Sequence, residues 1–556
     1  MKRGLHTMLV VCTALLLASC GTYKSLHHVP VTEGYNATIP VITRSHNDSV
    51  ATYGNNFLLQ NKHGLYEMYV EGDPYQLGLI NGSLSQNLIS IQEHSFLDKV
   101  KEIVPSKFKL SLLRQFLKWY NRKLYLHVPE EYKTEIYGIS HYASKDYDDV
   151  APPYLRLLYL HAAHDIGHAL TDLSMVGCTS FAAWGNNTSD GKLLLARNLD
   201  FYAGDTFAQN KIVLFIKPDK GYPFMSVTWG GMIGTLSGMN NQGLTITLNA
   251  GRSDIPTMAK TPISLLAREI LQYASTIDQA IAIAKKHEVF VSESLMIGSA
   301  NDHKAVLIEM SPNKFGVYDV PNSTQIICSN HFQSDAYKDD KNNEEAIESS
   351  HSEYRFERMT QLLEQNPKVD PAKAAAIMRN TNGLDDKAIG YGNEKAINQL
   401  LAHHSVIFKP EQKLVWVSSN PYQLGAYVAY NLDEVFGSNH KNIAGSVAID
   451  SLLIPEDKFV HSTAFKNYEQ YRIKDRQIED ALKTGGILPP GFIEEYQALN
   501  PEFWEVYYKA GVYNYKRGYY AVAKLQFAKA LSKEITTLPD KNAVEAYLKK
   551  TNNKLK

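Results

Sequence analysis

The sequence predicts an α+β fold in which stacked sheets are covered by helices. After residue 178 the apolar pattern changes from helical spacing to short runs of strand-forming residues. Three turn segments typical of hairpins separate consecutive runs: Ser189-Asp-Gly, Pro218-Asp-Lys-Gly and Asn240-Asn-Gln-Gly. Helical segments at 263–274 and 277–287 then divide these strands from later ones. Consecutive hairpins indicate antiparallel sheets, and strand runs divided by a helical layer favour a layered sandwich.

Residues 1–19 are predicted to be an export signal. Lys2 and Arg3 precede an uncharged stretch at 8–18, which is too short to span a bilayer. Leu17-Ala-Ser-Cys20 resembles a bacterial lipobox, so Cys20 is expected to carry lipid and tether the chain to the membrane of the cell envelope, on the periplasmic or the surface side. A plain secretory signal is the alternative. Cys12 would leave with the signal.

Residues 20–63 are polar and without periodicity, which predicts a tether. Residues 64–177 are predicted to be mainly helical, because 110–120 and 154–161 place apolar residues at i, i+3 and i+4. We expect this helical segment to be a separate N-terminal unit.

Residues 178–458 are expected to form the core domain. The hairpin strands are predicted at 179–184, 192–197, 212–216, 224–228, 234–238 and 244–248. Further strands are predicted at 294–298, 305–310, 315–319 and 325–329, followed by a helical stretch near 350–380 and a strand pair at 405–408 and 413–418.

Residues 459–556 are predicted to be a helical tail. Gly511, Ala523, Phe527 and Ala530 match one tetratricopeptide-like helix pair. Because a single repeat cannot bury its own face, we expect this pair, capped by a helix near 541–550, to dock on the core domain.

Composition excludes several classes of function. The chain of 556 residues has 57 Lys and Arg against 58 Asp and Glu, so no basic excess points to nucleic acid. Four cysteines exclude a disulfide scaffold and a multi-cysteine zinc ribbon. Once Cys12 and Cys20 are assigned to the signal and the lipid, Cys178 and Cys328 remain for chemistry.

Cys178 is the candidate nucleophile. It follows Gly177 where the helical segment ends and the first strand begins, although a buried cysteine at such a place is usually a small apolar residue. The return strand of the hairpin ends in Arg197-Asn-Leu-Asp200 and brings Arg197 back toward Cys178. A guanidinium beside a thiol lowers the thiol pKa, and a carboxylate can hold an amine.

Three further polar residues follow later strands: Asn249, Asn330 and Arg355. Each has an ordinary explanation by itself, as a turn former or a solvated charge. Together with Gly177-Cys-Thr-Ser, Arg197-Asn-Leu-Asp, Gly238-Met-Asn-Asn-Gln-Gly-Leu, Ser329-Asn-His-Phe and Ser352-Glu-Tyr-Arg-Phe-Glu-Arg, they resemble the cysteine N-terminal-nucleophile hydrolases. The most similar family is the acyl-coenzyme A:6-aminopenicillanic acid acyltransferase-like family, with choloylglycine hydrolase and acid ceramidase as relatives.

The resemblance implies a four-layer αββα sandwich made as a precursor that cleaves itself between Gly177 and Cys178. The new α-amine of Cys178 would then be the general base, because its ordinary pKa of about 7.7–8.0 suits neutral pH. By the same resemblance Arg197 flanks the thiolate, Asp200 anchors the α-amine and Asn249 donates to the oxyanion. Asn330 orients the amine or the substrate, and Arg355 completes the charged ring.

The implied reaction is hydrolysis or transfer of an acyl group at a linear amide through a Cys178 thioester, with no cofactor and a small N-acyl substrate. Phe201, Tyr202 and Phe207 are candidates for an acyl pocket. Strand alternation places Cys328 on the same face as Asn330, and we expect Cys328 to be reduced and buried as packing.

Two alternatives remain open. The first is a catalytically inactive binding module on the same scaffold. The second is a zinc hydrolase, because His164-Asp-Ile-Gly-His168 places two imidazoles at i and i+4 on a predicted helix at 154–170 that also carries His161 and Asp165. Against zinc, the usual Glu is absent from this motif and no third ligand follows at short range. No metal is expected.

Overall fold

The computed structural model describes residues 22–45, 49–162, 165, 177–201, 204–253, 258–320, 322–441 and 443–556. The predicted signal, its lipobox and Cys20 lie outside these ranges. Within them, no helix is both long enough and apolar enough to cross a bilayer.

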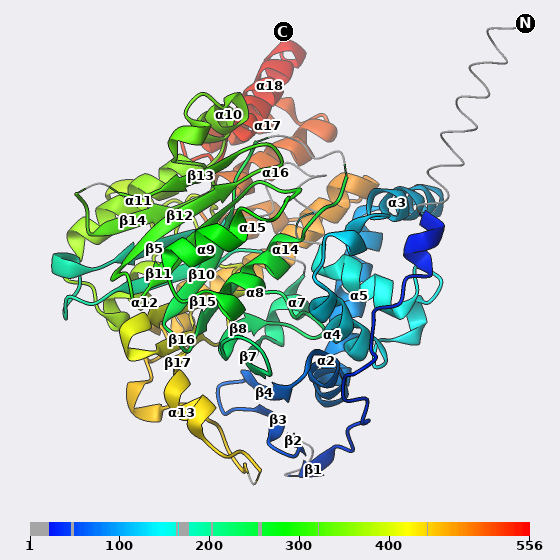
Figure 1. The fold of residues 1–556 in the computed structure, drawn as a ribbon. Helices are drawn as coiled ribbons and strands as arrows, with labels where there is room; N and C mark the ends of the chain where they lie inside the picture. The colour runs from blue at the N-terminus through cyan, green and yellow to red at the C-terminus, as the bar shows by residue number, and fades with distance from the viewer. Residues whose placement is uncertain are drawn as a thin grey trace, which may run out of the picture.

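Two sheets form the body of the molecule (Figure 1). Within the described ranges, the large sheet has eleven strands in the order β1-β2-β3-β4-β7-β8-β9-β10-β11-β12-β13, and the small sheet has six in the order β14-β5-β6-β15-β16-β17. The large-sheet strands are β1 Thr43–Ser45, β2 Val50–Tyr53, β3 Asn56–Gln60, β4 Tyr66–Gly72, β7 Ile212–Pro218, β8 Phe224–Thr228, β9 Ser237–Asn240, β10 Leu244–Ala250, β11 Glu293–Ser299, β12 Lys304–Met310 and β13 Phe315–Tyr318. The small-sheet strands are β5 Thr179–Ala183, β6 Leu194–Leu199, β14 Gln325–Cys328, β15 His404–Lys409, β16 Leu414–Ser418 and β17 Tyr427–Asn431.

The predicted four-layer αββα sandwich is confirmed by the way buried side chains alternate along the strands. In β7, Leu214 faces a cluster shared with helices α2 (Pro74–Ile103), α8 (Ile263–Tyr273) and α9 (Ile277–Ala284). The next residue, Phe215, faces a second cluster between the two sheets, together with Val406 of β15. Ile407 of β15 faces a third cluster under α11 (Ser352–Gln365) and α12 (Pro371–Met378). Helices therefore cover the outer face of each sheet.

The predicted tether over residues 20–63 is wrong for its second half, where β1, β2 and β3 lie. Phe57, Leu58 and Leu59 are buried in that region, but a run this short among polar residues gives little periodic signal. The helical segment at 64–177 also begins with a strand, because β4 pairs in parallel with β7. That pairing joins residues far apart in the sequence, so no hairpin turn predicts it.

Helices occupy most of the remaining N-terminal segment: α2, α3 (Lys107–Tyr120), α4 (Glu130–Ser140) and α5 (Pro153–His161). The helix predicted at 154–170 ends at His161 in the described part of the chain, and 163–164 and 166–176 lie outside that part. The predicted strand at 234–238 is displaced to β9, which pairs with β8 and β10 through Gly238 and Met239.

A buried ion pair joins the N-terminal segment to the core. The Arg268 guanidinium of α8 donates to both carboxylate oxygens of Glu135 in α4, at 2.9 and 2.6 Å, and both side chains are 1% exposed. Such a pair contributes little relative to an apolar pair, but removing one partner leaves a buried charge without compensation.

We expect Glu135→Ala to lower the free energy of unfolding by about 3–5 kcal/mol, because it leaves the Arg268 charge buried without its partner. Chemical denaturation measures this change. The matched control is Asp98→Ala, which removes an exposed partner of Lys101 at 2.9 Å and should change stability by less than about 0.5 kcal/mol. Equal effects of the two substitutions would contradict the prediction.

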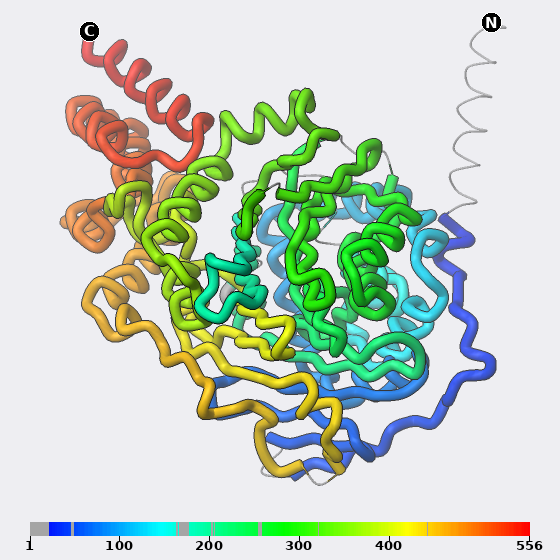
Figure 2. The backbone as a smooth tube through the Cα atoms, turned by 60° about the vertical axis from the view of Figure 1, so that its left-hand side comes forward, coloured from blue at the N-terminus to red at the C-terminus, as the bar shows by residue number. Residues whose placement is uncertain are grey.

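The predicted helical tail is confirmed and consists of α14 (Thr463–Thr484), α15 (Phe492–Leu499), α16 (Trp504–Lys516), α17 (Tyr520–Leu531) and α18 (Leu538–Lys554). In Figure 2 it projects from one side of the body, coloured orange to red. Gly511 of α16 lies against the ring of Phe527 in α17, where a Cβ would come within 2.6 Å of a ring carbon. The tail docks on the core through Glu534, whose carboxylate accepts from Lys395 at 2.7 Å and Lys387 at 3.0 Å.

Candidate active site

Cys178 lies immediately before β5, between β14 and β6 in the small sheet, and is 1% exposed. The Gly177 N–H donates to the carbonyl of Asp200 at 3.2 Å, which holds the start of β5 against the end of β6. Because Ser180 is paired with Arg197 in this hairpin, the return strand carries Arg197 back to the start of β5. Nη2 of Arg197 lies 3.5 Å from Sγ of Cys178.

Arg197 is fully buried and is held from the large sheet. Its Nη1 donates to Ser237 Oγ at 2.6 Å and to the Leu236 carbonyl at 3.3 Å, and its Nη2 also donates to the Leu248 carbonyl. Burial raises the pKa of the Cys178 thiol, and the Arg197 charge opposes that rise. The guanidinium therefore sits where it stabilises a thiolate.

Asp200 follows β6 and is fully buried. Among the described residues, neither of its carboxylate oxygens has a hydrogen-bond partner. Burial raises the pKa of Asp200 to about 7, although the charges of Arg355 and Arg197 act in the opposite direction. An unsatisfied carboxylate in the interior is costly, and a nearby ammonium would remove that cost.

We expect Asp200→Asn, made in a Cys178→Ala chain so that no cleavage intervenes, to change how stability depends on pH. The folded-state pKa of about 7 exceeds the ordinary 3.8, so the contribution of Asp200 to stability is largest below pH 4 and is lost as pH rises to about 7. Asn does not ionise. The free energy of unfolding of the Asn chain, relative to that of the Asp chain, should therefore rise by about 4 kcal/mol between pH 4 and pH 7 and stay constant above pH 7. Denaturation at several pH values tests this, and parallel curves would contradict it.

Arg355 in α11 joins three of the predicted site segments. Its Nη1 donates to the carbonyl of Cys178 at 2.7 Å and to Thr179 Oγ1, and its Nη2 donates to Asn330 Oδ1 at 2.6 Å. The guanidinium is fully buried, and burial lowers the pKa of Arg355 to about 10. Asn330 in turn donates to the Ala250 carbonyl at 2.8 Å. Arg355 and Asn330 thus position the main chain at Cys178.

Asn249 is brought to the same region but points elsewhere. Its amide donates to the carbonyls of Cys328 and Ser329 at 3.1 and 3.2 Å, and its Oδ1 accepts from Ser180 Oγ at 3.2 Å. The expected oxyanion role is therefore not displayed in this uncleaved chain, because both amide contacts are with main-chain oxygens.

Cys328 pairs with Ser180 in the sheet, is fully buried, and is a free thiol like Cys178. Its Sγ lies 3.5 Å from the Ser329 carbonyl oxygen, and burial raises the pKa of the thiol. This agrees with the reduced, packed cysteine expected from the sequence.

Two polar features of this region were missed by sequence reasoning. The Gln399 side chain donates to the Gly177 carbonyl at 2.7 Å. Nε2 of His404 lies 2.9 Å from Ser237 Oγ, which also accepts a hydrogen bond from Arg197. Nδ1 of His404 lies 2.8 Å from Nδ1 of His403. Adjacent histidines at a strand start were a visible signal, whereas Gln399 lies in an irregular segment with none.

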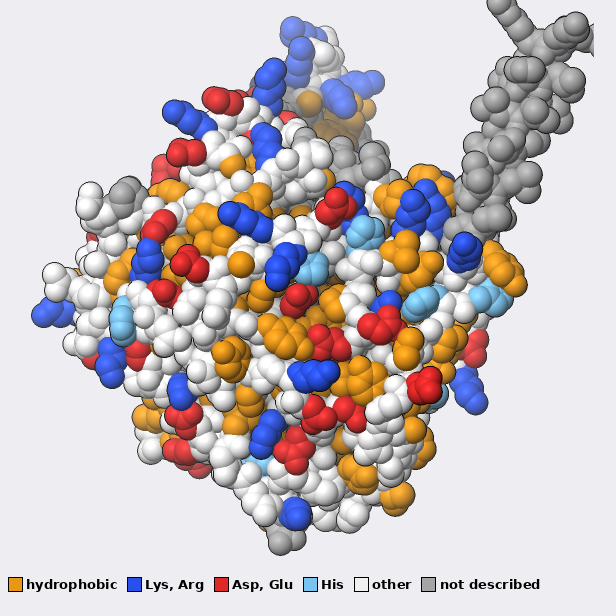
Figure 3. Space-filling view, in the orientation of Figure 1, with side chains coloured by type: hydrophobic (Ala, Val, Ile, Leu, Met, Phe, Trp, Pro, Cys, Tyr) orange, Lys and Arg blue, Asp and Glu red, His pale blue; other side chains and the backbone are white. Residues whose placement is uncertain are grey.

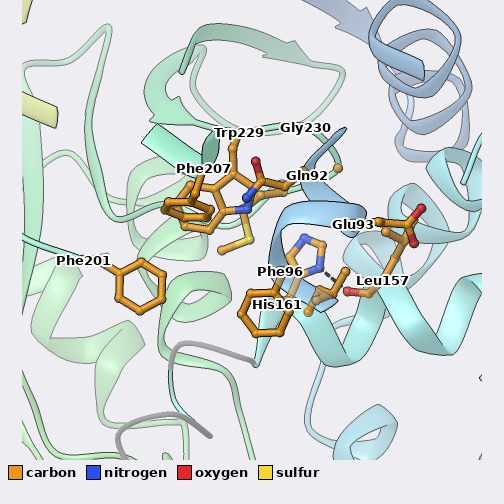
Figure 4. Close-up of a pocket in the computed structure, with 12 residues that line it drawn as sticks. Gln92, Glu93, Phe96, Leu157, His161, Phe201, Phe207, Trp229 and Gly230 are labelled. Atoms are coloured by element: carbon orange, nitrogen blue, oxygen red, sulfur yellow. Dashed lines mark hydrogen bonds between the residues drawn. The ribbon is translucent and has the colours of Figure 1, made fainter. Parts of the chain in front are cut away.

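Phe201, which follows Asp200 in the chain, and Phe207 line a cavity together with Trp229 (Figure 4). Gln92, Glu93 and His161 add polar groups to its lining. The rings of Phe201 and Phe207 are 5.4 Å apart, and those of Phe207 and Trp229 are 4.9 Å apart. Tyr202, the third pocket candidate, lies outside the described residues.

His161 also lines this cavity, and both of its ring nitrogens are engaged. Nδ1 lies 2.8 Å from the Leu157 carbonyl, and Nε2 accepts from the Ile233 N–H at 2.9 Å. Burial lowers the pKa of His161 to about 4. Asp165 accepts from the Ile263 N–H at 2.8 Å, and no group of three potential metal ligands occurs in the described part of the chain. His164 and His168 lie outside it.

Residues 186–420 match the family model of acyl-coenzyme A:6-aminopenicillanic acid acyl-transferase. The match includes the segments of Arg197 and Arg355 and begins after Cys178. The family resemblance stated from the sequence is thereby confirmed, and it supports an enzyme of the amidase or acyltransferase kind.

Curated relatives are 22–27% identical to this chain over the aligned residues. An uncharacterized protein of Archaeoglobus fulgidus is 27% identical over an alignment of 279 residues that covers 46% of this chain and 45% of the relative. Protein dcd1B of Dictyostelium discoideum is 23% identical, over 45% of this chain and 51% of the relative. An N-acylethanolamine-hydrolyzing acid amidase of Caenorhabditis elegans is 22% identical, over 38% and 58%. The chain thus spans about half the length of these relatives.

Solved structures give more distant similarities. The N-acylethanolamine-hydrolyzing acid amidase ortholog of Caenorhabditis elegans has a TM-score of 0.30 and 17% identity, covering 42% of this chain and 93% of its own. A mutant conjugated bile acid hydrolase from Clostridium perfringens has a TM-score of 0.32 and 14% identity, covering 49% and 96%.

Proposed function

We propose that the chain is a precursor of a cysteine hydrolase that cleaves itself between Gly177 and Cys178 and then hydrolyses linear amides. The observation that carries the proposal is the buried contact between Arg197 and the Cys178 thiol, next to a carboxylate of Asp200 that lacks a partner among the described residues. A thiol beside a guanidinium is prepared to become a nucleophile, and the carboxylate is placed to receive an ammonium.

In the proposed mature enzyme, the α-amine of Cys178 takes the thiol proton while Sγ attacks the substrate carbonyl. Collapse of the tetrahedral intermediate transfers that proton to the leaving amine and leaves a thioester on Cys178. Water then opens the thioester, which releases the carboxylic acid and restores the thiol. Asp200 holds the protonated amine, and Arg355 keeps the Cys178 main chain in place.

The substrate class we propose is an N-acyl amide with an apolar acyl chain. The cavity of Phe201, Phe207 and Trp229 supports this, because most of its lining side chains are apolar and such a lining favours hydrocarbon groups. The name of the Caenorhabditis relative, an N-acylethanolamine-hydrolyzing acid amidase, agrees with that class. Water is the abundant acyl acceptor outside a cell, so we propose hydrolysis before transfer.

Positively and negatively charged side chains are interspersed on the face shown in Figure 3, in agreement with the net charge of −1. We propose no nucleic-acid partner. We further propose that Cys20 is lipidated and holds the enzyme at the cell envelope. Cys20→Ser should then move the protein from the membrane fraction to the soluble fraction, and retention in the membrane fraction would contradict lipidation.

Two measurements on the purified full chain test the catalytic proposal. Intact mass should show two fragments that join at Gly177 and Cys178. A panel of N-acyl amides that share one amine should give kcat/KM values that rise with acyl length until the cavity is filled. An uncut chain without turnover would instead favour the binding module.

A further inference from the structure

Gln399 makes a buried contact with the peptide bond that the proposed self-cleavage breaks. It lies in the irregular segment between α12 and β15 and is 1% exposed. Its Nε2 donates to the Gly177 carbonyl oxygen at 2.7 Å. Among the described residues, this is the one hydrogen bond found on that oxygen.

The other site residues direct their hydrogen bonds elsewhere. The Arg355 guanidinium binds the carbonyl of Cys178, one residue further along, and the Asn249 amide binds the carbonyls of Cys328 and Ser329. The donor on the Gly177 oxygen is therefore supplied by Gln399 and not by the residues expected from the sequence.

The same contact explains why residue 177 is a glycine. A Cβ at this position would lie 2.2 Å from Nε2 and 2.4 Å from Oε1 of Gln399. A methyl group there would displace the Gln399 amide from the carbonyl. The contact of Gln399 with the carbonyl therefore requires that residue 177 has no side chain.

We infer that the Gln399 amide stabilises the negative charge that develops on the Gly177 oxygen during self-cleavage, a role that rests on the proposed function. Sγ of Cys178 forms a bond to the Gly177 carbonyl carbon, and the electron pair of the C=O double bond moves to the oxygen. When that pair returns, the C–N bond breaks and the nitrogen of Cys178 takes the proton that the thiol lost. Water hydrolyses the resulting thioester to the Gly177 carboxylate and the free thiol, so one water is consumed.

A preorganised donor on an oxyanion is worth a large factor in rate, because the donor need not reorganise as the charge appears. We expect Gln399→Met, which keeps the length but removes the donor, to slow self-cleavage of freshly purified precursor by about 100- to 1000-fold. Gln399→Leu, which also lacks a hydrogen-bond donor, should be slow as well. The rate is measured from the time course of intact masses.

Gln423→Met is the matched control. Gln423 is fully buried, and neither of its amide atoms has a hydrogen-bond partner among the described residues. This variant should cleave at the rate of the unmodified chain. Thermal unfolding of each precursor shows whether it is folded, and if Gln399→Met does not fold, Gln399→Leu decides the test.

A double-mutant cycle separates a direct role from general packing. Gly177→Ala should slow self-cleavage at least tenfold when Gln399 is present, because the methyl group displaces the amide. In a Gln399→Ala chain, the same substitution should add less than about threefold, since the donor is already absent. Additive effects of the two substitutions would overturn the inference.

The results also separate this inference from the proposed function. An unmodified chain that is never cut at Gly177 overturns the function. An unmodified chain that is cut, with Gln399→Met and Gln399→Leu cut equally fast, overturns only the role of Gln399.

Discussion

Cys178→Ala is expected to leave the chain in one piece and to lower amide hydrolysis by roughly 10⁵-fold or more, because it removes the only proposed nucleophile. The two effects share one cause, since the thiol that breaks the Gly177 peptide bond is also the thiol that attacks substrate. Intact mass of the purified variant and release of amine from an N-acyl substrate measure them separately.

Cys328→Ala is the appropriate comparison, because Cys328 is the other buried free thiol in the described chain. We expect this variant to be cut and to turn over substrate within a few-fold of the unmodified enzyme. A Cys178→Ala chain that is still cut, or that still turns over substrate, would end the proposal of a Cys178 nucleophile.

Arg197→Met is expected to lower kcat/KM at neutral pH by about 100-fold. The Arg197 charge, 3.5 Å from the sulfur, favours the thiolate and so opposes the rise in the pKa of Cys178 that burial causes. Without that charge the thiol pKa rises, and each unit of rise removes about nine-tenths of the thiolate present at a given lower pH.

The pH profile distinguishes this electrostatic role from a loss of packing. The acid limb of kcat/KM should move to higher pH in Arg197→Met and return toward its original position in Arg197→Lys, which restores a positive charge. A lower rate with an unmoved acid limb would show that Arg197 acts only structurally, through the hydrogen bonds that it donates to the Leu236 and Leu248 carbonyls.

The sheets were predictable where strand order follows chain order. The first hairpin, with β5 and β6, carries its own turn signal, and it is also the element that brings Arg197 to Cys178. The β4–β7 pair was not predictable, because its strands are parallel and more than a hundred residues, including strands β5 and β6, lie between them. Local patterns predict local pairing, and tertiary packing decides the rest.

The same distinction applies to the site. The family motifs brought Arg355 and Asn330 into the prediction, and the structure places them together at Cys178. Gln399 could not be found this way, since its contact with Gly177 spans 222 residues and its own neighbourhood is an irregular segment. Asn249 shows the converse: a motif locates a residue, but the direction of its amide depends on which carbonyls the fold places beside it.

The parallel pairing of β4 with β7 has a consequence for the proposed enzyme after it is cut. Residues before Gly177 would supply one edge of the large sheet and would remain bound as a second chain. Unfolding would then release two molecules in place of one, so recovery would become bimolecular and would weaken on dilution. The uncut chain can refold by itself, whereas the lifetime of the mature enzyme would depend on how slowly it unfolds.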